Sequence, residues 1–129
     1  MSTEFSDLKG KIIREIQGCE KGSDTIIFKM FDGAEYVLSH AQDWCEQVNV
    51  VDVIGDPKDI LMVPILLAEK VIQKKENNVD AIAMWTFYKL STIWANITIR
   101  WLGESNGYYS IGVNFNQTKE GTYPYDTTN

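Results

Sequence analysis

The sequence has few of the residues on which catalysis and metal binding usually depend. Its 129 residues include one histidine and two cysteines, Cys19 and Cys45, which lie far apart. It has no glycine-rich phosphate loop, no dinucleotide-binding fingerprint and no nucleophile elbow. Two distant cysteines are typical of reduced cytosolic thiols rather than of a disulfide framework. These absences predict a non-enzymatic protein without a bound cofactor.

Basic residues are also scarce. The chain has 12 Lys and Arg residues against 18 Asp and Glu, a formal net charge of −6, and its only arginines are Arg14 and Arg100. Proteins that bind nucleic acid neutralise phosphates with a basic surface, so direct nucleic-acid binding is not expected. Mimicry of DNA would need long acidic stripes, which the sequence lacks. A small acidic patch facing a basic cleft on a partner protein fits the charge better.

No apolar stretch reaches the roughly 18 residues that a membrane-spanning helix needs. The longest one, residues 60–68, is interrupted by Pro64. The chain begins with a mostly polar, acidic segment, and no basic segment precedes an apolar run, so a signal peptide is not expected. We therefore expect the protein in the cytoplasm and away from the membrane.

The sequence does contain enough apolar material for a folded core. Hydrophobic residues make up 44% of the chain and aromatic residues 12%, a composition that excludes disorder. The length fits a single domain over residues 1–129, with an N-terminal segment at 1–8 and a flexible tail at 118–129.

Turn signals divide the chain into short segments with the alternation of strands and little helical periodicity. Asp56 and Pro57 predict a short helix that Asp56 caps and that ends near Met62. Residues 75–80 are typical of a polar turn. We predict a mostly β fold: a strongly bent antiparallel sheet or small open β-barrel of about seven or eight strands, with one or two short helices. The expected strands are residues 11–17, 25–31, 34–40, 48–54, 65–74, 81–90, 94–102 and 108–115.

Two turns allow the register of pairing to be predicted. Asp32-Gly33 is the strongest hairpin signal, because the two-residue turn that it favours needs positive φ. Such a turn places Lys29 opposite Tyr36. Near the C-terminus, the last three expected strands form a meander, and its second loop, 103–107, places Arg100 opposite Ser110 on a polar face and Trp101 opposite Tyr109 on an apolar face. A slip of one residue would bury the polar set, so the pattern favours this register.

The polar face of this meander mixes large aromatic side chains with hydrogen-bonding ones. Aromatic planes stack on flat rings, and the fork of Arg100 suits a phosphate or a carboxylate. We therefore predict a ligand pocket or a partner surface; the competing interpretation is that this face packs under the N-terminal hairpin or simply meets solvent. The residues are Trp85, Phe87, Trp94, Asn96, Thr98, Arg100, Ser110 and Asn114.

Residues 40–46 hold the single histidine, one thiol and two carboxylates. Such groups bind zinc or form a Cys–His nucleophile pair. However, neither a Cys-x-x-Cys nor a His-x-x-x-His spacing is present, and a corner between strands with Trp44 and Cys45 buried competes with both readings. The metal candidates are His40, Asp43, Cys45 and Glu46.

Several segments together carry a resemblance, of which the run from Thr98 to Ser110 is the most specific. The segments are Leu8-Lys9-Gly10-Lys11, His40-Ala41-Gln42-Asp43-Trp44-Cys45-Glu46, Ile65-Leu66-Leu67-Ala68-Glu69, Trp85-Thr86-Phe87-Tyr88-Lys89, Thr98-Ile99-Arg100-Trp101 and Gly103-Glu104-Ser105-Asn106-Gly107-Tyr108-Tyr109-Ser110. They resemble an uncharacterised family of small bacteriophage and prophage proteins over roughly residues 8–115. The resemblance implies two cysteines after Asp43, but this chain has Trp44-Cys45 there, which weakens a metal site built on a pair of thiols.

The resemblance implies a phage accessory protein in the cytoplasm of a bacterial host, and it transfers no catalytic residues. We predict a non-enzymatic inhibitor that binds a host defence protein, with Glu104, Asn106 and Tyr108 extending the binding surface. One alternative is a sponge that binds a nucleotide-like signal on the aromatic face beside Arg100. Another is a metal-assisted enzyme at His40. Exposed edges of the sheet could pair with a second copy of the chain, so a homodimer is a further alternative.

Overall fold

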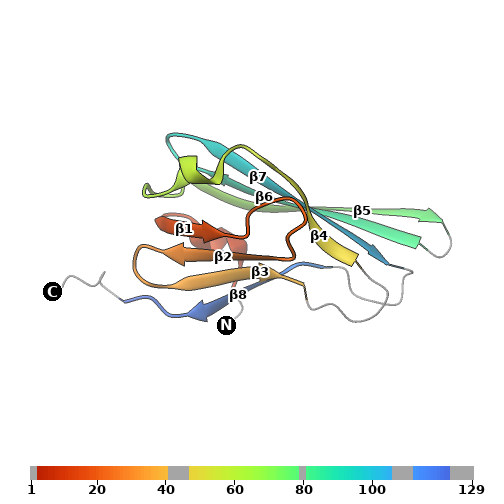
Figure 1. Cartoon of the computed structure of the whole chain (residues 1–129), viewed down its shortest axis with the longest axis horizontal. Helices are drawn as coiled ribbons and strands as arrows, with labels where there is room; N and C mark the ends of the chain where they lie inside the picture. Colours follow the sequence, from red (N-terminus) through yellow and green to blue (C-terminus); the bar gives the residue numbers. More distant parts are fainter. Residues whose placement is uncertain (1–2, 41–46, 79–80, 106–111, 123–129) are drawn as a thin grey trace.

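The computed structural model describes residues 3–40, 47–78, 81–105 and 112–122, and its described residues form strands and short 3-10 helices (Figure 1). The strands are β1 (Ile13–Gln17), β2 (Thr25–Met30), β3 (Glu35–Ser39), β4 (Gln47–Ile54), β5 (Leu67–Asn78), β6 (Ala81–Ser91), β7 (Asn96–Ser105) and β8 (Asn114–Lys119), and the helices are η1 (Phe5–Leu8) and η2 (Pro57–Ile60). The predicted mostly β fold is confirmed.

The strands form two four-stranded antiparallel sheets, which lie face to face as two layers (Figure 1). One sheet has the order β1-β2-β3-β8 and the other the order β4-β7-β6-β5. Within the described residues the sheets do not close into a barrel. Their facing surfaces supply the buried core, which includes Phe28 and Leu38 from the first sheet and Tyr88 and Trp101 from the second.

The hairpin of β2 and β3 is present, but its predicted register is wrong by one residue. Lys29 lies opposite Glu35, not opposite Tyr36. The N–H of Met30 donates to the carbonyl of Ala34 at 2.8 Å, so the loop between the paired residues has three residues rather than two. Gly33, the last residue of this loop, has a φ of 92°. A three-residue loop that ends in a left-handed glycine has this geometry. The longer loop aligns the buried residues of both strands on one face.

The predicted C-terminal meander is also wrong in its third strand. β8 pairs with β3 of the other sheet, and the place beside β7 belongs to β4. Trp101 therefore lies opposite Val50 rather than Tyr109. Phe115 of β8 stacks on Tyr36, with the ring planes 3° apart and the centroids at 5.3 Å, which anchors β8 to the first sheet. Burial of this ring outweighs the general preference for pairing strands that are neighbours in sequence.

Two shorter expectations are partly met. Asp56 caps η2 by accepting from the N–H of Lys58 at 3.0 Å, and Pro57 follows it, but the element is a single 3-10 turn that ends at Ile60. Strand β5 continues to Asn78, so most of the polar turn predicted at 75–80 belongs to a strand. Within the described residues, no helix is long and apolar enough to cross a membrane.

The two sheets are connected differently along their two sides. On one side, the N–H of Gly22 donates to the carbonyl of Val50 at 2.7 Å, and the N–H of Val50 donates to the carbonyl of Ser23 at 2.8 Å. These backbone hydrogen bonds join β4 to the turn between β1 and β2 of the first sheet. On the other side lie the edge strands β5 and β8. There Phe5 of η1 inserts between the layers, with its ring centroid 4.7 Å from that of Tyr88 and 5.4 Å from that of Phe115. The fold is thus joined on one side and separated by η1 on the other.

Candidate binding face

The outer face of the β4-β7-β6-β5 sheet carries most of the aromatic and polar side chains that the sequence groups together. Pairing of β6 with β7 sets Phe87 opposite Arg100 and Trp85 opposite Leu102. Alternation along β6 turns Tyr88 into the core, where it is fully buried. Trp85 and Phe87 therefore face outward, as the alternation of the sequence predicts, while their role in binding stays a prediction.

An ion pair fixes Arg100 on this face. Its Nε donates to Oδ1 of Asp52 and its Nη2 to Oδ2, both at 2.6 Å. The hydrogen bond from Arg100 lowers the pKa of the Asp52 carboxyl, and the same bond raises the pKa of the guanidinium. The side chain of Arg100 is 34% exposed and that of Asp52 is 40% exposed, so water screens the attraction between their charges. The bidentate geometry nevertheless gives Arg100 one defined orientation.

The oriented guanidinium completes a stack of planar groups. Cζ of Arg100 lies 5.5 Å from the centroid of the Trp85 ring. The rings of Trp85 and Phe87 are almost parallel, with an interplanar angle of 5° and centroids 6.0 Å apart. A cation over the face of an indole is attracted electrostatically by the ring. We call Asp52, Trp85, Phe87 and Arg100 the outer-face cluster: stacked planar groups whose two charges neutralise each other.

Trp94 does not lie on this strand face, so its predicted position is wrong, while its role in binding stays a prediction. It lies in the turn between β6 and β7 and is 72% exposed. Thr92 closes the turn, because its N–H donates to the carbonyl of Ala95 and its hydroxyl accepts from the N–H of Trp94. A tight turn formed by these bonds leaves no room for the strand to begin as early as Trp94.

Trp94 instead joins other exposed apolar side chains at one end of the second sheet. The N–H of Leu66 donates to the carbonyl of Ser91 at 2.8 Å, which brings the start of β5 beside the β6–β7 turn. Gly55, which follows β4, lies against the backbone of Asn96. We call the set the apolar end: Ile54, Met62, Leu66, Leu67, Ile93 and Trp94.

The remaining predicted binding residues are scattered. Thr98 is half-buried and Asn96 exposed on the outer face, and Glu104 is exposed near the far end of β7. Asn114 lies in β8 of the other sheet, away from the predicted group, because β8 does not pair with β7. Ser110, Asn106 and Tyr108 lie outside the described residues.

The metal candidates are only partly described. Nδ1 of His40 lies 2.7 Å from the carbonyl oxygen of Gly112, a hydrogen bond that orients the ring. Asp43, Cys45 and Glu46 lie outside the described residues. In the part of the chain that is described, no group of three or more His, Cys, Asp or Glu side chains is arranged to hold a metal ion. The metal hypothesis therefore stays a prediction.

Cys19, the other thiol, is free and half-buried in the structure. Burial raises the pKa of this thiol to about 12, with a smaller contribution from Glu20. The thiolate is the reactive form of cysteine, so Cys19 is poorly suited to act as a nucleophile at neutral pH.

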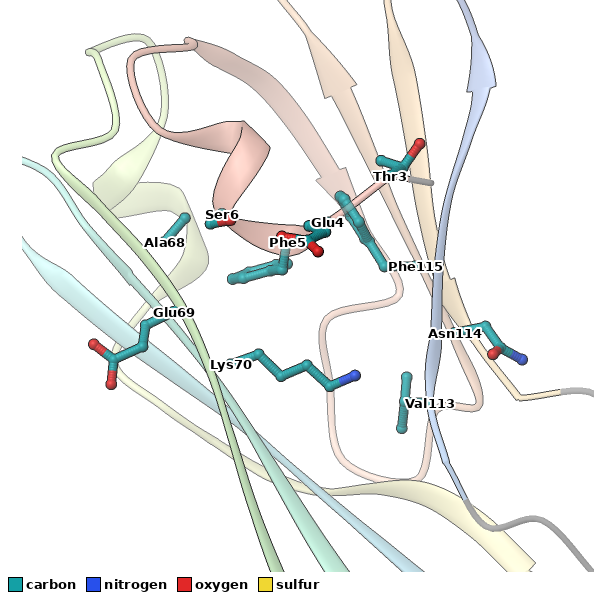
Figure 2. A pocket seen from close by; sticks show the side chains of 10 residues that line it. All are labelled: Thr3, Glu4, Phe5, Ser6, Ala68, Glu69, Lys70, Val113, Asn114 and Phe115. Carbon is teal, nitrogen blue, oxygen red and sulfur yellow. The ribbon is translucent and has the colours of Figure 1, made fainter. Parts of the chain in front are cut away.

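Sequence reasoning misses a cavity of about 580 Å³ on the side of the fold where the sheets separate (Figure 2). It is lined by side chains of η1, β5 and β8, among them Phe5, Lys70 and Phe115. These residues come from three distant parts of the chain, so no local motif marks them. The one usable signal is Phe5, an aromatic residue in an otherwise polar N-terminal segment.

Comparison with known proteins gives one match. A family model described as a domain of unknown function (DUF7448) matches residues 6–115. No curated protein and no solved structure matches the chain. The prediction of an uncharacterised family is confirmed at that level, while a phage origin stays a prediction.

Proposed function

The chain belongs to the DUF7448 family, and we propose that it is a non-enzymatic protein that binds a partner protein through the outer face of the β4-β7-β6-β5 sheet. The outer-face cluster is the centre of the proposed interface, and the apolar end extends it. The partner that we propose is a host defence protein, which the chain inhibits by occupying its surface.

One observation carries this proposal: the fork of Arg100 is already occupied. Both of its hydrogen-bonded nitrogens donate to Asp52, and its plane covers Trp85. A phosphate ligand would have to displace the carboxylate of Asp52, whereas a protein surface can pack directly on the stacked groups. Tryptophan and arginine in packed, oriented positions are the side chains that most often dominate protein interfaces.

The apolar end supports the same proposal. Trp94 and Ile93 are 72% and 65% exposed, and the neighbouring Ile54 and Met62 are more than half exposed. Single exposed apolar residues are ordinary, but a group of them at one end of a small domain is typical of an interaction surface. Such a surface gains free energy when a partner removes it from water.

Charge narrows the partner's chemistry. The chain carries a net charge of −6, while the charges of the outer-face cluster neutralise each other. A basic partner would be attracted by the overall field and would then pack on the aromatic groups. The resemblance to phage and prophage accessory proteins is what makes a host protein the proposed partner. The alternative function, binding of a nucleotide-like signal on the aromatic face, requires Arg100 to release Asp52. We therefore place this alternative second.

Affinity capture with matched variants tests the proposal. Tagged wild-type protein, the double variant Trp85→Ala/Phe87→Ala and the control Phe31→Ala are incubated with host lysate. Phe31 is 51% exposed and follows β2 in the other sheet, so its loss leaves the proposed interface intact. We expect one stoichiometric partner with the wild type and the control, and its loss from the double variant, provided that circular dichroism shows a folded protein. Retention by all three proteins, or loss from both variants, would contradict the proposal.

A further inference from the structure

The cavity on the separated side of the fold has the size and walls of a small-molecule site. Its volume of about 580 Å³ falls within the range of roughly 300–1,000 Å³ that is common for ligand pockets. It opens between β5 and β8, and the turn of η1 forms one wall (Figure 2). None of the outer-face cluster lines it, so the cavity is a feature separate from the proposed interface.

Aromatic rings form its apolar part. Phe5 and Phe115 both line the cavity, with their rings edge to face at 5.4 Å. Tyr88 lies beneath, its ring 4.7 Å from that of Phe5. Phe115 is held in place by the parallel stack on Tyr36. Phe5 and Tyr88 are buried, so the half-buried ring of Phe115 is the one that a flat aromatic ligand can contact with little rearrangement.

Lys70 is the one cationic side chain among the residues that line the cavity. It lies opposite Tyr88 in the sheet, and its Nζ is 6.0 Å from the centroid of that ring. Figure 2 shows the side chain extending from β5 across the cavity toward β8. Among the described residues, no carboxylate lies within ion-pair distance of this ammonium group. Lys70 thus differs from Arg100, whose charge is neutralised by Asp52.

Two carboxylates lie near the same space and limit the charge of a ligand. Glu69 is also among the lining residues, but its carboxylate extends to the opposite side of β5 from the ammonium group of Lys70 (Figure 2), as strand alternation requires. Glu4 lines the wall formed by η1 and its flanking residues. Lys70 would attract one anionic group of a ligand, and Glu4 would repel a second one.

We propose that this cavity binds a small molecule with one planar aromatic ring system and one anionic group, with the ring packed against Phe115 and the anion at Lys70. Lys70 would attract a carboxylate and a phosphate in the same way, so the experiment tests one ligand of each kind. Such a ligand would remain bound while the outer face engages a partner, because the two sites share no side chain.

Isothermal titration calorimetry of the full chain tests the proposal with two pairs of probes. Adenosine 5′-monophosphate is compared with adenosine, and indole-3-acetate with indole-3-acetamide. We expect at least one anion to bind with a dissociation constant below about 1 mM, and its neutral counterpart to bind at least about tenfold more weakly. Binding of the nucleotide alone assigns a phosphate ligand, and binding of the indole anion alone assigns a carboxylate.

Variants connect the result to the cavity. Lys70→Met keeps most of the apolar stem and should weaken the anion at least about tenfold. Lys74→Met is the matched control, because Lys74 is an exposed lysine further along β5 that does not line the cavity. Trp85→Ala/Phe87→Ala should bind the anion like the wild type, which separates this proposal from the proposed function. Absence of binding by both anions, or equal binding to wild type and Lys70→Met, would overturn the proposal.

Discussion

Tyr88 provides a quantitative test of how the core is built. The side chain is fully buried, and its hydroxyl has no hydrogen-bond partner among the residues that the structure describes. Burial also raises the pKa of this phenol. A buried hydroxyl without a partner costs roughly 1–3 kcal/mol on mutational scales. Tyr88→Phe keeps the ring and its 4.7 Å contact with Phe5 while removing the oxygen. We therefore expect the free energy of unfolding to rise by about 1–3 kcal/mol.

Urea denaturation measures this change directly. The midpoint should move to higher urea with an unchanged slope, because the surface exposed on unfolding is nearly the same. An increase of about 1 kcal/mol would raise the melting temperature by about 3–6 °C for a domain of this size. Tyr36→Phe is the control, since its hydroxyl is not among the buried atoms without a partner. A destabilised Tyr88→Phe would refute the reasoning, because it would mean that the hydroxyl makes a bond in solution.

Three further predictions follow from single contacts. Arg100 lowers the pKa of Asp52, so the pair stabilises the fold above the ordinary carboxyl pKa of about 4 and loses this contribution as the pH falls through the lowered value. The stability difference between wild type and Asp52→Asn should therefore shrink in denaturation series from pH 7 to pH 2. At Gly55, which has a φ of 96°, an added Cβ would lie 2.5 Å from a backbone carbonyl oxygen. Gly55→Ala should cost more than about 2 kcal/mol, against about 1 kcal/mol for Gly33→Ala, where φ is 92° but the space is open. Equal losses in thermal melts would argue against the steric account. The peptide that contains Cys19 should stay unmodified by iodoacetamide at pH 7 until the protein unfolds, because its thiol has a pKa raised to about 12; rapid labelling of the native state, read by mass spectrometry, would contradict this.

The residues of β6 and β7 show what local pattern can predict. Alternation alone separates Tyr88 and Trp101, which are buried, from Trp85, Phe87 and Arg100, which face outward. This separation depends only on the two-residue period of a strand, so it is independent of which strand lies next to it.

Contacts between distant segments could not be predicted in the same way. Asp52 and Arg100 are 48 residues apart, and their ion pair exists only because β4 takes the place beside β7. The cavity depends on Phe5, Lys70 and Phe115, which meet only after the two sheets pack. Periodicity specifies which face of a strand is apolar, but the order of strands depends on how whole faces fit together.

The turn between β2 and β3 shows a smaller limit. Asp32-Gly33 correctly marks the reversal, but a two-residue and a three-residue loop both use a glycine with positive φ. The side chain of Asp32 accepts from the N–H of Ala34 at 2.9 Å, which stabilises the longer loop. The choice between the loops shifts the pairing by one residue, and the burial of Ile26 and Leu38 on one face decides it.

The affinity of the captured partner for single variants tests the central claim most directly. With the purified partner in a calorimeter or on a biosensor, Trp85→Ala should weaken binding by about 30-fold or more, the loss typical of an interface residue that contributes at least about 2 kcal/mol. Phe31→Ala, on the other sheet, should stay within about twofold of wild type. Equal affinities for wild type and Trp85→Ala would contradict the claim that the outer-face cluster is the binding surface.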